Sequence, residues 1–549
     1  MKRNIFLVLI ATMLLMCRFA GAQNTSGLLF DRDIVSASSL ISLSQRNYTG
    51  TARSMAMGGA FTSLGADMSA FGVNPAGFGM YQRHELSATL GLGMVGAKNY
   101  GATSSSNYNS TTRFSFNNIG ASFLVYENTG SLTAINFAFG YNKTADYNFD
   151  FSYRSDPTTS SVADAFADIA NREGLGINAD NKICDPNGYA DYDMNPYFWT
   201  TALAYKGGLI NRGTNGWYPD EIGHGASMTQ QTRMKSRGAA SEFSFALGMN
   251  FSNILYFGLS LDIQSISRKQ TLYYNEFIDY PAGRPSGTDL PYQLYDTELG
   301  QSMQVSGSGV GAKFGLIVRP VKGLRIGVAI HTPTYYSMLY RYKASLSSKA
   351  LNAGSNPDGF TVSSDGFIYS EEFTPLLEDL GDSRWKFRTP TRILTGISYA
   401  VGQYFLISAD YEYDDFGGIR VLEAPVDADF INQSLGNGIR GQHTVRGGIE
   451  AKVVPAVALR VGGGYMSRIV DTDYIFGEPV MNGLWYASAG IGFRIGRITT
   501  IDLAYQYRKE RYTDYYSFYS VNNVGENYSP LYGLDLTRHN ISVTFGFKF

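Results

Sequence analysis

The stretch that decides the fold is Ile541-Ser-Val-Thr-Phe-Gly-Phe-Lys-Phe549, the last nine residues of the chain. Every odd-numbered position in it is apolar, and the positions between are serine, threonine, glycine and lysine. Successive side chains of a β-strand point to opposite faces, so one face of this strand is wholly apolar. An apolar face opposite a face of small and charged residues is typical of a strand whose outer side contacts lipid and whose inner side faces a lumen.

The same alternation recurs upstream, for example over 243–251, 257–263 and 485–495. We expect fourteen strands, at residues 84–97, 112–126, 132–149, 227–251, 255–277, 301–319, 323–345, 384–400, 403–423, 441–454, 456–473, 481–496, 498–516 and 534–549. Short and long connections alternate between them, which is typical of tight periplasmic turns and long outer loops. The sequence therefore predicts an all-β fold, a fourteen-stranded antiparallel transmembrane barrel over residues 84–549 with both termini in the periplasm.

The longest outer loops are expected at 150–226 and 346–383. In the first of them, Ser161 is suited to cap a helix that runs to Arg172 and ends before Gly174. Such a helix would place Val162, Phe166 and Ile169 on one stripe. Two interpretations of this stripe stay open: it packs the loop together, or it captures a hydrophobic ligand.

Residues 1–22 have the features of a secretory signal peptide, with Lys2 and Arg3, an apolar run and Ala20-Gly-Ala22 at the expected cleavage site. Cys184 is then the single cysteine of the mature chain, which excludes an internal disulfide and a cysteine-rich metal site. The whole chain has a net charge of −2, and removing the signal makes it more acidic, so nothing favours nucleic-acid binding. No cofactor is implied.

Residues 23–83 do not alternate, and they contain Gly50-Thr-Ala-Arg-Ser-Met-Ala-Met-Gly-Gly-Ala-Phe61, Asp67-Met-Ser-Ala-Phe71 and Asn74-Pro-Ala-Gly77. This segment resembles the N-terminal hatch, or plug, of the FadL/TodX family of outer-membrane transporters for long-chain fatty acids and other hydrophobic compounds. Looser likenesses follow in order at 327–333, 388–399 and 446–465. The family's barrel has fourteen strands, and the terminal phenylalanine resembles the signal that the outer-membrane assembly machinery recognises.

The resemblance implies passive uptake of hydrophobic molecules by loop capture, hatch rearrangement and lateral exit through a kink in the third strand. Gating residues would be Arg53, Gly58, Gly59, Asn74, Pro75 and Ala76. Candidate ligand contacts are Phe61, Phe71, Phe78 and Met80, together with Val162, Phe166 and Ile169; the alternative is that these side chains pack structurally. Gly140 is the candidate for the kink, although it also fits an ordinary strand glycine.

The resemblance further implies a location in the outer membrane of a Gram-negative bacterium, in contact with lipid and lipopolysaccharide. We expect a monomer, since a closed barrel has no edge to pair. The resemblance implies a channel and not an enzyme. Two other functions stay open from the sequence. Some related barrels are secretion-system shuttles that bind exported proteins. An outer-membrane hydrolase or haem-binding barrel is the other alternative, although none of the five histidines lies in a recognisable nucleophile motif.

Overall fold

The structure is a computed structural model, and it describes residues 36–47, 49–101, 108–155, 160–190, 194, 198–219, 228–278, 294–350, 367–373, 384–424, 428–436, 439–470, 478–518 and 531–549. The proposed signal peptide and residues 23–35 of the proposed hatch lie outside this part, as do most of the outer loop at 346–383.

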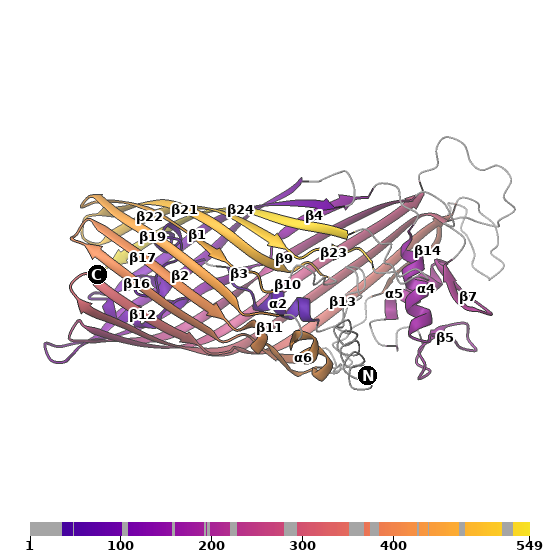
Figure 1. Cartoon of the computed structure of the whole chain (residues 1–549), viewed down its shortest axis with the longest axis horizontal. Coiled ribbons are helices and arrows are strands. Elements are labelled where there is room, and N and C mark those ends of the chain that lie inside the picture. The colour runs from indigo at the N-terminus through magenta and orange to yellow at the C-terminus, as the bar shows by residue number, and fades with distance from the viewer. Residues whose placement is uncertain are drawn as a thin grey trace, which may run out of the picture.

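The described chain forms a closed antiparallel barrel of 14 strands, as the alternation predicts (Figure 1). Several of these strands are interrupted and carry two labels. The wall elements are β1 (Glu85–Gly101), β2 (Tyr108–Glu127), β3 (Leu132–Asp146), β4 (Phe149–Arg154), β9 (Met228–Phe251), β10 (Leu255–Ile278), β11 (Leu294–Val321), β12 (Leu324–His331), β13 (Tyr335–Ala350), β15 (Arg384–Arg388), β16 (Arg392–Val401), β17 (Phe405–Asp414), β18 (Arg420–Glu423), β19 (Gln442–Val454), β20 (Val457–Met466), β21 (Met481–Ile495), β22 (Thr499–Tyr512) and β24 (Leu531–Lys548).

The barrel closes through the C-terminal strand, whose alternating sequence predicted the fold. β24 pairs with β22 on one side and with β1 on the other, with Phe547 opposite Leu86 and Phe545 opposite Ala88. Phe545 and Phe547 are 39% and 45% exposed on the outside, whereas Ser542 and Thr544 are buried on the inside. Closure leaves this pair of terminal strands without a free edge.

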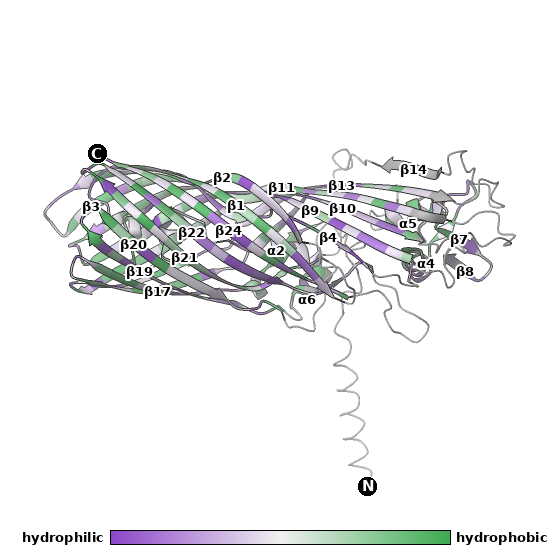
Figure 2. Ribbon diagram, turned by 90° about the horizontal axis from the view of Figure 1, so that it is seen from above, coloured by the Kyte–Doolittle hydropathy of each residue, from purple (hydrophilic) through white to green (hydrophobic). Residues whose placement is uncertain are grey.

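The outer surface of the barrel carries an apolar belt. Residues that alternate along the strands are exposed and hydrophobic on the outside, for example Phe243, Phe245 and Leu247 on β9 and Leu261 and Ile263 on β10. The ribbon coloured by hydropathy shows this alternation (Figure 2). So large an exposed apolar surface requires lipid around it. Among the described helices, none is long and apolar enough to cross a membrane.

The lumen is filled by the N-terminal segment. It contains α2 (Ala37–Ser44), α3 (Ala52–Ala56) and the two 3₁₀ helices η1 (Met68–Phe71) and η2 (Pro75–Met80). Each of the four is capped at its N-terminus by the side chain of the preceding residue. Ser36, Thr51, Asp67 and Asn74 accept the free backbone N–H groups there. From here on, the hatch means residues 49–81, the part of the predicted segment 23–83 that contains α3, η1 and η2.

The outer end of the barrel is covered by a second group of elements, at the end opposite the C-terminus (Figure 1). The predicted loop helix is confirmed as α4 (Val162–Arg172), with Ser161 and Asp164 forming a capping box. α4 packs with α5 (Trp199–Lys206) and with the hairpin of β7 (Ile210–Gly213) and β8 (Gly216–Pro219). Shorter elements elsewhere in the chain are β5 (Gly176–Ile177), β6 (Ile183–Cys184), β14 (Phe367–Phe373), η5 (Phe416–Gly418), α6 (Ala428–Gly436) and β23 (Tyr515–Tyr516).

Candidate functional site

The hatch packs against wall glycines that face the lumen. Gly248, Gly258, Gly315, Gly327, Gly448 and Gly462 form this set, which we call the glycine belt. A Cβ atom on any of them would lie under 3.0 Å from hatch atoms, most of them in the main chain. The missing side chains let the hatch backbone approach the strands directly, so hatch and wall are matched in shape.

Asn74 and Pro75 lie at the centre of this contact. The Asn74 side chain accepts the Ala76 N–H at 3.0 Å and donates to the Thr62 carbonyl at 2.7 Å. Its Nδ2 also lies 3.4 Å from the carbonyls of Leu316 and Val328 in the wall. A buried amide that joins two parts of the hatch and reaches two strands makes this turn stiff.

Two wall side chains hold hatch carbonyls that precede Asn74. Lys313 donates to the Phe71 carbonyl at 2.6 Å, and His331 Nε2–H donates to the Val73 carbonyl at 2.9 Å. Arg392 lies 3.4 Å from the other ring nitrogen of His331, which accepts, so the ring carries its proton on Nε2. Lys313 also pairs with Glu242 at 2.9 Å and Asp262 at 3.3 Å, and all three side chains are buried. These wall contacts resist displacement of the hatch.

The other hatch residues expected to gate the channel contact the opposite wall. Arg53 pairs with Glu450 at 2.9 Å, and Glu450 in turn accepts from Arg460 at 2.7 Å. Gly58 and Gly59 have φ values of +63° and +76°, which favour glycine. Gly58 also accepts from the Tyr486 hydroxyl at 2.7 Å. These positions hold the hatch in place; their role in gating stays a prediction.

The candidate ligand contacts of the hatch are placed as follows. Phe71 and Phe78 are fully buried with ring centroids 4.5 Å apart, Phe61 is 3% exposed, and Met80 is half-buried. The Phe71 ring lies against Gly120 and Gly140, which are paired across β2 and β3. The arrangement packs the hatch against the wall, and ligand contact by these side chains stays a prediction.

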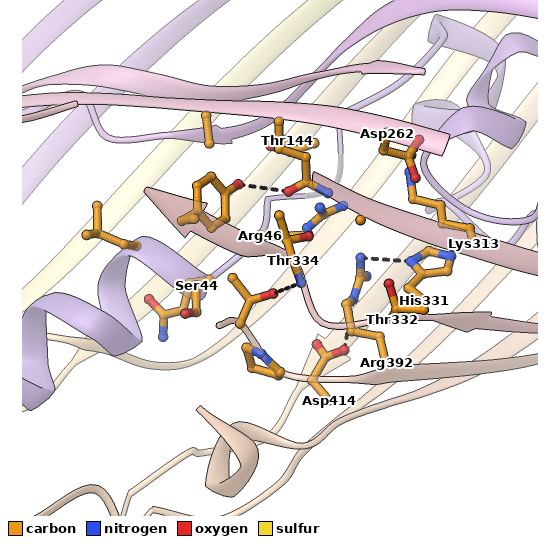
Figure 3. A pocket seen from close by; sticks show the side chains of 18 of the residues that line it. Ser44, Arg46, Thr144, Asp262, Lys313, His331, Thr332, Thr334, Arg392 and Asp414 are labelled. Carbon is orange, nitrogen blue, oxygen red and sulfur yellow. Dashed lines mark hydrogen bonds and ion pairs between the residues drawn. The ribbon is translucent and has the colours of Figure 1, made fainter. Parts of the chain in front are cut away.

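A cavity with about 590 Å³ of empty space lies at the lumen side of this contact (Figure 3). Its labelled lining includes Arg46 from the segment before the hatch, with Lys313, His331, Arg392 and Asp414 from the wall. Further cavities of about 610 and 580 Å³ share Asn47, Thr49 and Lys143 with one another. The lumen next to the hatch is therefore a chain of cavities lined by both polar and apolar groups.

The backbone ladder of the wall is interrupted beside one of these cavities. The ladder between β2 and β3 runs from the Glu127 end only as far as Asn118 opposite Asn142. Beyond it, the edge of β2 facing β3 pairs with no described strand, while β4 pairs with β9. The far end is bridged by side chains, because Asn109 Nδ2 donates to Ser152 Oγ at 3.0 Å. We call this interruption the wall opening.

β3 departs from regular pairing close to this opening. Gly140 itself pairs with Gly120 and with Ser244, and one of the two irregularities in the β3–β9 ladder falls between Lys143 and Ala145. Asp146 then accepts from Lys143 at 2.7 Å and from the Asn148 N–H at 2.9 Å. This local turn starts β4, whose Phe149, Phe151 and Tyr153 are buried within the barrel.

The outer cap is joined to the barrel through a buried carboxyl. Val162, Phe166 and Ile169 of α4 are buried in the apolar core of the cap. Glu276 accepts the Val162 N–H at 3.0 Å and the Tyr274 hydroxyl at 2.8 Å. It lies on the part of β10 that projects beyond the apolar belt. Burial raises its pKa from 4.5 to about 7, although the hydrogen bonds act in the opposite direction.

The cap should loosen as the pH rises. Because the folded-state pKa lies above the ordinary value of 4.5, the protonated carboxyl stabilises the cap fully below about pH 4.5, and this contribution is lost as the pH rises through about 7. Hydrogen exchange of the α4 amides, corrected for the intrinsic rate, should therefore be roughly tenfold faster at the alkaline plateau than at the acid one. Glu276→Gln should remove most of this dependence, and an unchanged pH profile in that variant would refute the assignment.

Comparisons with known proteins were made for sequence and for structure. No family model matches the chain, and no curated protein sequence matches it. A FadL homologue from Pseudomonas aeruginosa superimposes with a TM-score of 0.50 at 11% identity, covering 92% of this chain and 99% of that one. The chain has the fold of a FadL-type barrel. The toluene transporters TodX of Pseudomonas putida and TbuX of Ralstonia pickettii give TM-scores of 0.49 and 0.45 at 12% and 14% identity, each covering 92% of this chain and 99% of the other.

Within this FadL-type fold, sequence reasoning missed the wall residues that hold the hatch. Lys313 stands in the glycine-rich Gly307–Lys313 stretch of β11, where the alternation marks it only as a lumen residue. His331 is distinguished in the sequence only as a histidine beside Thr332-Pro333. The signal that could have identified Lys313 is a cation at a lumen-facing position two residues before Gly315. The missing side chain of Gly315 lets the hatch approach the wall.

Proposed function

We propose that this protein is an outer-membrane channel for the passive uptake of hydrophobic molecules such as long-chain fatty acids. The observation that carries the proposal is the wall opening beside a lumen cavity. The cavity is lined by Met55 and Val95 as well as by Asn117, so both apolar and polar groups face it. A molecule that leaves sideways through the wall passes into lipid and avoids the polar side of the hatch.

The direction of travel follows from the hydrophobic effect. Each methylene that leaves water for an apolar medium gains about 0.8 kcal/mol, so a long acyl chain favours a route that ends in the bilayer. In this proposal the apolar outer cap captures the molecule, the hatch shifts, and the molecule leaves between β2 and β3. Gly140 contributes by giving Phe71 room against the wall on the hatch side of the opening.

The charged rim of the opening suits an amphipathic ligand. Arg113 Nε is buried and has no hydrogen-bond partner among the described residues. Lys143 and Arg538 line the same cavity, and both interact with Asp146. An anionic headgroup could contact this rim while its chain passes into lipid, which favours a fatty acid over an uncharged hydrocarbon as the preferred ligand.

Filling the opening should stop uptake. Ser115 faces the cavity from the unpaired part of β2, so Ser115→Trp places a large ring in the opening. In cells lacking their own channels for hydrophobic compounds, we expect uptake of radiolabelled oleate to fall about tenfold or more, with toluene as a second probe. Thr395→Trp, at an exposed outward position on β16, is the matched control.

Two outcomes would count against the proposal. A folded Ser115→Trp barrel with the uptake of the unmodified protein would exclude exit through the wall opening. Native mass spectrometry of the detergent-purified barrel offers an independent check, since a copurified polypeptide without any small hydrophobic molecule would favour a secretion shuttle instead.

A further inference from the structure

Four strands carry a row of basic and polar side chains on the outside of the barrel, beyond the apolar belt. Register places Arg237 of β9, Lys269 of β10, Gln304 of β11 and Arg341 of β13 opposite one another from strand to strand. Opposite residues of an antiparallel pair point to the same face, so these four side chains form one row. Arg237, Lys269 and Arg341 are exposed.

A second row lies two residues further along the same strands. It joins Lys235, Thr271, Ser302 and Lys343 by the same pairings. Together the five basic residues of the two rows form what we call the basic outer face. Within the described chain, Lys235 lies 3.9 Å from the Asp150 carboxylate. Neither Arg237 nor Lys269 forms an ion pair with a described residue, so no described carboxylate neutralises these two charges.

The rows between the apolar belt and the basic outer face change from apolar to hydroxyl side chains before the cations begin. Ile263 lies opposite Phe243 and Val310 in an apolar row that ends the belt. The next row consists of the four serines Ser241, Ser265, Ser308 and Ser337. Two residues beyond that row come Ala239, Ser267, Ser306 and Leu339, and then the basic outer face begins.

The distance between these rows places the basic outer face beyond the hydrocarbon layer. Lys269 follows Ile263 by six residues, which is about 20 Å along a strand and about 14 Å of height at a tilt of roughly 45°. The face therefore lies above the end of the apolar belt, on the headgroup side of the outer leaflet. Hydroxyls followed by cations are the groups that a phosphorylated sugar requires, since sugars take hydrogen bonds from serine and phosphates pair with arginine and lysine.

We propose that the basic outer face is a binding site for the phosphorylated glycolipid headgroup of the outer leaflet. The serine row contacts its sugars, and Arg237 and Lys269 pair with its phosphates. The two central strands at this level, β10 and β11, are paired on both sides, so Lys269 is presented on a rigid surface and little order has to be gained on binding. The site is distinct from the wall opening and does not depend on the transported molecule.

The test uses the full barrel in a neutral detergent with bisphosphorylated lipid A as the probe. Arg237→Gln combined with Lys269→Gln should weaken binding about thirtyfold in native mass spectrometry, at about 1 kcal/mol for each cation at a charged lipid surface. Lys322→Gln combined with Arg497→Gln removes two exposed cations from turns at the other end of the barrel and should leave the affinity unchanged. Heat-dependent migration on gels checks that both variants fold.

Three results would overturn the proposal. The first is that the two double variants bind lipid A with equal affinity. The second is that the unmodified barrel binds lipid A stripped of its phosphates as tightly as intact lipid A. The third is that an equal concentration of inorganic phosphate displaces lipid A completely. The last result would show that the face binds phosphate without selecting a lipid. Weaker binding of intact lipid A as the salt concentration rises would support the proposal, because exposed charges are screened by salt.

Discussion

Gly258→Val should displace the hatch and open a water-filled path through the barrel. A Cβ atom at Gly258 would overlap the backbone of Pro75 and Ala76, and valine adds two further carbons. Overpacking a close-fitting contact costs about 1–3 kcal/mol, so the population of the displaced hatch should rise about tenfold or more. The measurement is ionic conductance of the purified barrel in planar bilayers, together with the sensitivity of cells to large antibiotics.

The control for this substitution is Gly447→Val. Gly447 lies in β19 beside the belt glycine Gly448, but a Cβ atom there meets only one atom at 3.9 Å. This variant should keep the low conductance of the unmodified barrel. If Gly258→Val folds and its conductance is equally low, then the hatch does not depend on the glycine belt for its position.

Lys313→Met should cause the largest loss of stability of any single change considered. Methionine removes the ammonium that joins Glu242, Asp262 and the Phe71 carbonyl. Glu242 keeps Arg46 at 3.4 Å, whereas Asp262 loses its cation and stays buried beside Glu242. Breaking a buried ion pair by removing one partner costs about 3–5 kcal/mol. The urea midpoint of unfolding from lipid vesicles should therefore fall clearly, and hatch amides near Phe71 should exchange faster.

A compensated variant separates charge from packing. Lys313→Met together with Glu242→Gln and Asp262→Asn removes the cation and both carboxylates, so most of the lost stability should return. The hatch amides should stay less protected, because the bond to the Phe71 carbonyl is still missing. An unrescued midpoint would mean that Lys313 stabilises the barrel by its packing and not by its charge.

The wall of this protein could be predicted from its sequence in detail. Period-two alternation in segments such as 243–251 identifies both the strand and its lipid face, because lipid tolerates no polar group on that side. The capped helix at Ser161 was also predictable, since its cap and its apolar stripe are local in sequence. Such features depend on neighbours a few residues apart.

The contacts between the hatch and the wall could not be predicted in the same way. Alternation shows that Gly258 and Lys313 face the lumen, but the residues they meet there lie about 180 and 240 positions away in the chain. The wall opening was equally hidden, because β2 has the same alternation in its paired part and in its unpaired part. Whether the ladder is interrupted depends on the path of β3, so the sequence of β2 does not reveal it.

The glycine belt also limits how this protein can diverge. A substitution that widens or narrows the wall at those positions must be matched at once by the backbone of the hatch, and backbone cannot be adjusted by a single change of side chain. Natural selection is therefore left with two freely adjustable regions, the outer cap and the rim of the wall opening. New ligand preferences should arise through changes in those two regions, while the glycine belt and Asn74-Pro75 stay as they are.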